Sequence, residues 1–223
     1  MDSIKHKESL LHSFVEWAKE FNIPVLEWVE HDSYLAGGYF RGVPRDLKKA
    51  ASLKELNLFG CELEVIPSSI AAFENIEKLY LRGNLLKSLP KEIGLLKNLK
   101  ELYLSANVLE SLPKELGDLT NLEALYLQEN CLQLLPDEIQ NLQNLKILEL
   151  GSNRLSSVPN AITKLKSLEK LTLWKNSITS FPNALQALKN LKEFDFVYNR
   201  VALCDEDVLW LEELLQSGCE IDF

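Results

Sequence analysis

Histidine and cysteine are the side chains most able to act as bases, nucleophiles or metal ligands, and their positions here favour none of these roles. The three histidines, His6, His12 and His31, all fall in the first 31 residues. No two of the four cysteines have the CxxC spacing of a zinc or redox site. The motifs GxSxG, HExxH, GxxxxGKS/T and GxGxxG are absent. We therefore expect a chain that is not an enzyme and holds neither a metal nor a cofactor.

Tyrosine and asparagine instead recur at a fixed interval of 23 residues. Tyr80, Tyr103 and Tyr126 have this spacing. So do six asparagines: Asn84, Asn107, Asn130, Asn153, Asn176 and Asn199. Tyrosine is a rigid, amphipathic side chain that is enriched where proteins recognise partners. An inward asparagine amide can bond the backbone groups that a sharp turn leaves unpaired. The spacing predicts one column of phenols and one structural ladder of amides.

The repeated unit that would position these columns reads LxxLxLxxNxLxxLPxxIxxLxx, and six copies run over residues 53–190. In LxLxx the leucines alternate with polar residues, which is the period of a β-strand. Such a strand is too short to stand alone, but copies stacked ~4.8 Å apart form a parallel sheet. Each buried leucine contributes roughly 1.5–3 kcal/mol, and the coils need neighbours to bury it. The sequence therefore predicts a solenoid.

This unit resembles the leucine-rich repeat family over about residues 53–203. Its 23-residue LPxxI form is similar to the class found in Ras-suppressor-like proteins and in bacterial intracellular-type repeats. The resemblance implies an α/β fold, a curved solenoid with a parallel sheet on its concave side. Short helical or 3₁₀ segments would form the convex side, and helical caps would close the N- and C-terminal ends.

Residues 1–52 are predicted to cap the first coil. The segment ESLLHSFVEWAKEF has apolar residues at helical spacing, which indicates an amphipathic helix over residues 8–22. We expect Trp17 and Trp28 to lie in the core of this cap. Residues 30–52 are similar to a repeat unit in their proline and apolar positions, so we interpret them as a degenerate first coil.

Residues 191–223 are predicted to form a partial seventh repeat and a C-terminal capping helix. Asp205 suits the N-cap of this helix, and Gly218 suits the position after its end. The predicted buried stripe is Val208, Leu211, Leu214 and Leu215. Cys204 takes a leucine position of the repeat, which predicts a buried thiol. The tail CEIDF is expected to pair beside the last strand.

Strand alternation places a second set of side chains on the outer, concave face of the sheet. Ile147 and Trp174 are large apolar residues at such positions, and exposed apolar groups indicate a partner surface. The predicted partner-binding residues are Tyr80, Tyr103, Tyr126, Arg82, Phe59, Trp174, Ile147 and Glu149. Whether the tyrosines bind a partner or only stabilise the sheet stays open at this point.

The charge of the chain restricts its partners. Of the formal net charge of −9, −7 falls in residues 191–223, which contain two basic and nine acidic residues. An acidic chain without a basic stripe argues against binding nucleic acid. No apolar run is long enough to span a membrane. Unpaired cysteines and the lack of a signal-like start favour a cytoplasmic protein, with export without a cleavable signal as the alternative. We expect a monomer, and a dimer is not excluded.

The function that the sequence favours is a non-enzymatic protein–protein interaction module, such as a signalling scaffold, that binds a protein partner through the concave face. Three alternatives stay open. The chain could be a bacterial effector or virulence factor that binds a host protein. It could regulate a GTPase or phosphatase, as its resemblance to related repeat proteins implies. As a weaker alternative, its aromatic face could bind carbohydrate.

Overall fold

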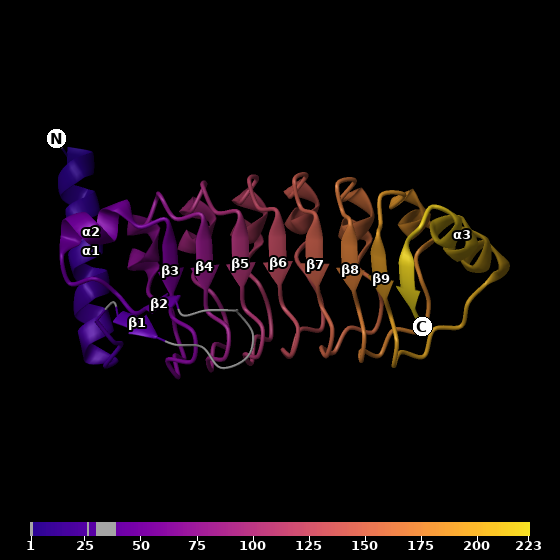
Figure 1. Cartoon of the computed structure of the whole chain (residues 1–223), viewed down its shortest axis with the longest axis horizontal. Helices are drawn as coiled ribbons and strands as arrows, with labels where there is room; N and C mark the ends of the chain where they lie inside the picture. The colour runs from indigo at the N-terminus through magenta and orange to yellow at the C-terminus, as the bar shows by residue number, and fades with distance from the viewer. Residues whose placement is uncertain (1, 26, 30–38) are drawn as a thin grey trace.

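The structure is a computed structural model that describes residues 2–25, 27–29 and 39–223. Figure 1 shows a solenoid whose strands stand side by side along the long axis, with a helix at either end. The α-helices are α1 (Asp2–Glu20), α2 (Leu47–Ser52) and α3 (Asp205–Gln216). The strands are β1 (Glu27–Val29), β2 (Tyr39–Arg41), β3 (Glu55–Asn57), β4 (Lys78–Tyr80), β5 (Glu101–Tyr103), β6 (Ala124–Tyr126), β7 (Ile147–Glu149), β8 (Lys170–Thr172), β9 (Glu193–Asp195) and β10 (Glu220–Asp222). The 3₁₀ helices are η1 (Ser68–Ala72), η2 (Lys91–Leu95), η3 (Lys114–Asp118), η4 (Asp137–Asn141), η5 (Asn160–Lys164) and η6 (Asn183–Ala187).

Strands β3 to β10 form one parallel sheet of eight strands in sequence order. From β3 to β9 each strand pairs with the next at an offset of 23 residues, as in the pairs of Leu56 with Leu79 and of Leu79 with Leu102. The predicted solenoid with a parallel sheet is therefore confirmed. Because the register is constant, residues at the same repeat position lie in rows that run across the strands.

The leucines of the repeat form one continuous core between the strands and the 3₁₀ helices. In the coil that begins at Leu99, the apolar repeat positions are all buried: Leu99, Leu102, Leu104, Leu109, Leu112, Leu116 and Leu119. A single coil has nothing to cover these side chains, so each coil depends on its neighbours for burial.

A proline precedes each 3₁₀ helix, as the LPxxI phrase suggests. Its φ lies between −60° and −72° in all six coils, at the value that the pyrrolidine ring fixes. The proline keeps the chain extended as it leaves the core, and the 3₁₀ helix then returns an apolar residue such as Ile93 to the interior.

The N-terminal cap is a helix, as predicted, but with other bounds. Helix α1 covers residues 2–20 instead of 8–22, and it ends before Asn22, whose φ is 51°. Phe14 is fully buried, and its ring lies 4.7 Å from that of Phe73 at the end of η1. Trp17 is partly buried against the core, whereas the side chain of Trp28 lies outside the described residues.

The structure describes only part of the predicted degenerate first coil, so the prediction stays untested. Residues 30–38 of that prediction lie outside the described residues. Strand β2 pairs antiparallel with β1 and does not extend the parallel sheet, and α2 follows it. A single antiparallel bridge, between Gly42 and Asn57, joins this segment to the first parallel strand.

The C-terminal cap has the predicted helix and tail. Gly218 follows α3 with a φ of +89°, and β10 pairs in parallel with β9. The N-cap is Cys204 instead of Asp205, because the Asp207 carboxylate accepts the Cys204 backbone N–H at 3.0 Å. Cys204 is exposed, which corrects the expectation of a buried thiol.

The buried stripe of α3 is also corrected. Leu211 and Leu214 are buried as expected, but Val208 and Leu215 are 42% and 51% exposed. Trp210 is buried in their place, with its ring 5.4 Å from Phe194 in β9. Packing this large ring against the last coil sets the rotation of the helix and turns the two smaller residues outward.

Candidate functional site

The outward side chains of β3 to β10, with the residues directly after each strand, form what we call the sheet face. In its middle row, Tyr80 pairs with Tyr103 and Tyr103 with Tyr126. Their ring centroids lie 4.6 Å and 4.5 Å apart, at interplanar angles of 14° and 7°. This spacing follows from the distance between neighbouring strands. The three residues, which we call the tyrosine column, are partly buried and hold one another in place.

The hydroxyl ends of the tyrosine column lie among carboxylates. The Tyr103 hydroxyl donates a hydrogen bond to Glu101. Burial raises the pKa of Tyr103, and the bond to Glu101 raises it further. Burial also raises the pKa of Tyr126, with Glu149 as the second cause. The phenols therefore stay protonated and act as neutral hydrogen-bond donors at physiological pH.

The other predicted binding residues lie around this column, but not all together. Arg82 and Phe59 are partly buried near its N-terminal side, and Ile147 and Glu149 lie on β7, directly beside the column. Trp174 follows β8, five strands away from Phe59, or roughly 24 Å at ordinary strand spacing. A partner would have to be extended across the strands to contact them all.

Ile147 and Trp174 are partly buried, whereas the sequence suggested exposed side chains. Trp174 lies over Gly151 of the preceding coil. A Cβ atom added at Gly151 would fall 1.9 Å from the Trp174 indole nitrogen. The missing side chain at Gly151 thus makes room for the indole to lie against the sheet.

A polar network joins the strands beyond the tyrosine column. The Ser105 hydroxyl donates to Gln128 at 2.7 Å, and the Gln128 amide donates to Glu149 at 2.6 Å. The Lys170 ammonium group contacts Glu149 at 3.2 Å and Glu193 at 2.8 Å. These contacts fix side chains from β5 to β9 before any ligand arrives.

The C-terminal end of the sheet face has an excess of acidic groups. Strand pairing places Glu220 beside Glu193 and Asp222 beside Asp195. Burial raises the pKa of Asp195, and the neighbouring carboxylates of Asp222 and Glu193 raise it further. The sequence analysis assigned no role to these residues, because their pairing depends on where the tail docks.

The asparagine ladder lies inside the turn that follows each strand. The Asn107 amide donates to the carbonyls of Leu81 and Leu104, each at 2.9 Å, and accepts the Leu86 N–H at 3.1 Å. The same pattern of bonds holds the other five members: Asn84, Asn130, Asn153, Asn176 and Asn199. Cys61 takes the corresponding place in the first coil, where its thiol donates to the Phe59 carbonyl. These side chains are engaged with backbone, which suits a structural role.

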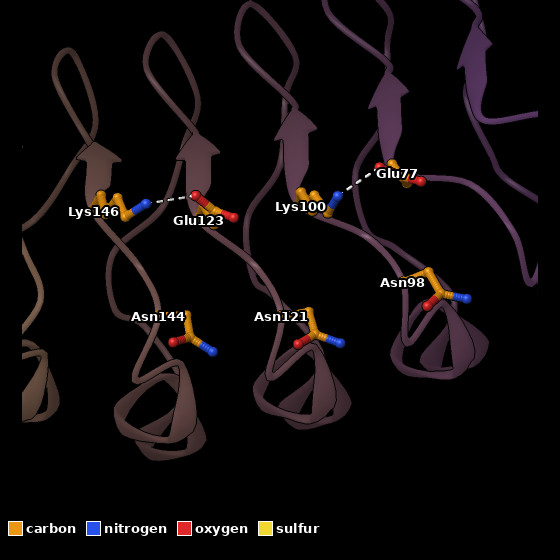
Figure 2. Close-up of a pocket in the computed structure, with 7 residues that line it drawn as sticks. All are labelled: Glu77, Asn98, Lys100, Asn121, Glu123, Asn144 and Lys146. Carbon is orange, nitrogen blue, oxygen red and sulfur yellow. Dashed lines mark hydrogen bonds and ion pairs between the residues drawn. The ribbon is translucent and has the colours of Figure 1, made fainter.

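A groove lies on one flank of the solenoid and has a volume of about 410 Å³. Figure 2 shows asparagines along one of its sides and alternating glutamates and lysines along the other. Its lining residues are Glu77, Asn98, Lys100, Asn121, Glu123, Asn144 and Lys146. The Asn98, Asn121 and Asn144 amides each donate to a carbonyl of the preceding coil, at 2.7–2.9 Å.

The charged side of this groove is also occupied by internal bonds. Glu77 contacts Lys54 at 2.9 Å and Lys100 at 2.6 Å, and Glu123 contacts Lys146 at 2.7 Å. Hydrogen bonds from Lys100 and Lys54 lower the pKa of Glu77 to about 2. The sequence analysis missed this second asparagine row, although it has the same 23-residue spacing as the first. Because most of its polar groups join coil to coil, the groove is a weaker candidate site than the sheet face.

Neither metal chemistry nor a membrane span receives support from the part of the chain that the structure describes. There, no three His, Cys, Asp or Glu side chains gather as a metal ion would require. No described helix has the length and apolar character needed to cross a membrane.

Comparison with known proteins identifies related chains. The family model described as "Leucine-rich repeat region" matches residues 102–220, and the one described as "Leucine Rich Repeat" matches residues 52–73. A leucine-rich repeat protein of Leptospira interrogans is 37% identical, with a TM-score of 0.72 over 78% of this chain and 43% of that chain. The plant peptide hormone receptor RGFR1 in complex with RGF2 is 25% identical, with a TM-score of 0.65 over 81% of this chain and 33% of that chain. The chain thus spans less than half of either structure, and a search of the curated proteins finds no match.

Proposed function

Because the chain belongs to the leucine-rich repeat family, we propose that it is a non-enzymatic module that binds a protein partner through its sheet face. The observation that carries the proposal is the tyrosine column. Its rings are held in one orientation by mutual stacking, and their hydroxyls lie among Glu101 and Glu149. Tyrosines fixed in this way give a large contact area and lose little conformational entropy on binding.

The surroundings of the tyrosine column support the same function. Arg82, Ile147 and Trp174 add a cation and two apolar groups to one continuous face. A stable protein interface buries roughly 1,200–2,000 Å² in total, which a face of eight strands can supply. The similar plant receptor is seen in complex with RGF2, which supports the use of such a solenoid as a binding surface.

A carbohydrate ligand finds less support. Sugars bind aromatic side chains by stacking on their faces, but the faces of the tyrosine column are directed at one another, about 4.5 Å apart. The ring edges and hydroxyls remain for contact, and these suit the polar and apolar groups of a protein.

The test removes the tyrosine column and measures partner binding. The partner is first isolated with the wild-type chain from its native source and identified by mass spectrometry. The variant Y80A/Y103A/Y126A is expected to bind it more than about tenfold more weakly by calorimetry, because clustered aromatic residues dominate interface energies.

Tyr198→Ala is the matched control, since Tyr198 is 78% exposed and lies outside the column. Far-UV circular dichroism and thermal unfolding establish that each variant is folded. Equal affinity of the wild type and the folded triple variant would refute the tyrosine column as the binding site.

A further inference from the structure

The charges on the sheet face are balanced along most of its length but not at its C-terminal end. Lys78 contacts Glu101 at 3.1 Å, and Lys170 lies between Glu149 and Glu193. The pairing of β9 with β10 instead places acids beside acids. Within the described residues, no ion pair forms at Asp195, Glu220 or Asp222.

Asp195 is the most constrained of these acids. It is partly buried, one carboxylate oxygen accepts the Val197 N–H at 3.0 Å, and Asp222 is its neighbour in the row. Like charges placed directly opposite on neighbouring strands destabilise a sheet. Burial is the first cause of the raised pKa of Asp195, and the carboxylates of Asp222 and Glu193 together add to it, whereas the Lys170 ammonium group opposes it.

Thr172 gives a second, independent observation. It is 6% exposed and pairs with Glu149 on one side and Asp195 on the other, in the same outward row. Among the described residues its hydroxyl has no hydrogen-bond partner. A buried hydroxyl without a partner is costly, so a group that can bond to it would be favoured there.

A second copy of this chain fits the site poorly. If the free edge of β10 paired with its own copy, Glu220 and Asp222 would come close to identical acids. A cationic side chain from another protein fits both observations, since its N–H groups can donate to the carboxylates and, once the Thr172 side chain rotates to turn its hydroxyl outward, to that oxygen as well.

We propose that Thr172, Asp195 and Asp222, which we call the acidic subsite, receive a lysine or arginine side chain from an extended segment of the protein partner. The inference rests on the proposed function, because it places this side chain on the same face as the tyrosine column. Trp174, two residues after Thr172, offers an aromatic group near which the cation can lie. The partner is therefore a basic segment, which an acidic face attracts and orients.

The experiment uses fluorescein-labelled octapeptides of alternating serine and arginine, or serine and lysine, and measures fluorescence anisotropy with the full chain. A peptide of alternating serine and glutamine is the uncharged comparison. The basic peptides are expected to bind more tightly, and their affinity is expected to fall as salt is added.

Two variants locate the subsite. Asp195→Asn keeps an oxygen for the Val197 N–H but removes the charge, and we expect it to lower the affinity for the basic peptides about tenfold. Thr172→Val is expected to lower the affinity for the same peptides several-fold. It is also expected to raise the denaturant midpoint, because a buried hydroxyl without a partner is removed. Asp137→Asn, on η4, has the same change in net charge and is expected to leave binding unchanged.

Three results would overturn the inference: equal binding of the glutamine peptide, equal losses in Asp195→Asn and Asp137→Asn, or a lower denaturant midpoint for Thr172→Val. The last would mean that the hydroxyl is bonded within the protein. This outcome is separable from failure of the proposed function. If the peptide experiment fails but partner binding still depends on the three tyrosines, only the acidic subsite is refuted. If the peptide experiment succeeds but the partner binds the tyrosine variant as tightly as the wild type, only the tyrosine column is refuted.

Discussion

At the scale of single residues, buried polar side chains in this protein are of two kinds. Asn107 uses both polar atoms of its amide in bonds of 2.9–3.1 Å to three backbone groups from two coils. Thr172 is equally buried, but its hydroxyl has no partner among the described residues. The first kind stabilises the turn, and the second costs stability. This contrast separates the side chains that hold the solenoid from those that are available to a ligand.

Replacing Asn107 by alanine tests the structural kind. The change leaves two carbonyls and one N–H without a partner in a buried turn, so we expect a loss of about 3 kcal/mol in the free energy of unfolding. Asn121→Ala is the matched control, because that exposed amide makes a single bond, to Lys97, and we expect its loss to be about 1 kcal/mol. Urea denaturation measures both, and equal losses would contradict a special role for the turn ladder.

At the scale of elements, each coil is joined to the next by backbone pairing in the sheet and by side chains on the flank. On the flank, Glu77 lies between Lys54 of the preceding coil and Lys100 of the following one. A carboxylate bonded by two ammonium groups favours its ionised form, so its pKa falls. This contact therefore depends on pH, although its groups are exposed to solvent and its contribution is small.

Glu77→Gln measures that contribution. The folded pKa of Glu77, about 2, lies below its ordinary value of 4.5. The stability it adds is therefore fully present above about pH 5 and is lost as the pH falls toward 2. We expect the wild type to be more stable than the variant at pH 6 and the difference to vanish in strong acid. Chemical denaturation over this range, repeated at about 1 M salt to screen the pairs, checks it. A difference that is constant with pH would contradict the assignment.

The repeat made the elements of the solenoid predictable, because one register fixes all of its coils. Strand positions, the buried leucines and the tyrosine column follow from the 23-residue spacing alone. The caps are not repeated, so nothing in the sequence sets their rotation. The ring of Trp210 decides which face of α3 is buried, and local pairing decides how β1 and β2 lie.

The candidate site was predictable to a lesser degree. Alternation along the strands places Tyr103 and Glu149 outward, but it does not give their burial or their partners. How closely the Trp174 side chain lies against the sheet depends on Gly151 in the neighbouring coil, where a larger residue would collide with the indole. The acidic subsite requires the tail to dock beside β9, so that Asp222 meets Asp195, and only the folded chain brings these two together.

At the scale of the whole molecule, the solenoid is a row of similar coils closed by an aromatic cluster at each end. Phe14 of α1 packs against Phe73 at the N-terminal end, and Trp210 of α3 packs against Phe194 at the other. In such a row each coil contacts only its neighbours, so stability is close to a sum of local terms. Damage at one end should therefore remain near that end.

Phe14→Ala and Trp210→Ala form a reciprocal test of this locality. Each removes a buried aromatic ring, which costs about 3–5 kcal/mol in a well-packed core. We expect Phe14→Ala to lower hydrogen-exchange protection in β3 and β4, and Trp210→Ala to lower it in β8 and β9. Amide exchange followed by mass spectrometry reads both ends at once. Uniform loss along the whole chain in either variant would show that the solenoid unfolds as a single unit.

The flank row reads lysine and glutamate in strict alternation, and this has a consequence for how many coils can be added or removed. Its members are Lys54, Glu77, Lys100, Glu123, Lys146, Glu169 and Lys192. Loss or duplication of one 23-residue coil would set two equal charges side by side, whereas a change of two coils at once keeps the order intact. For the charges of this flank, then, the repeating unit is a pair of coils, and an engineered variant that gains or loses two coils at once keeps every lysine beside a glutamate.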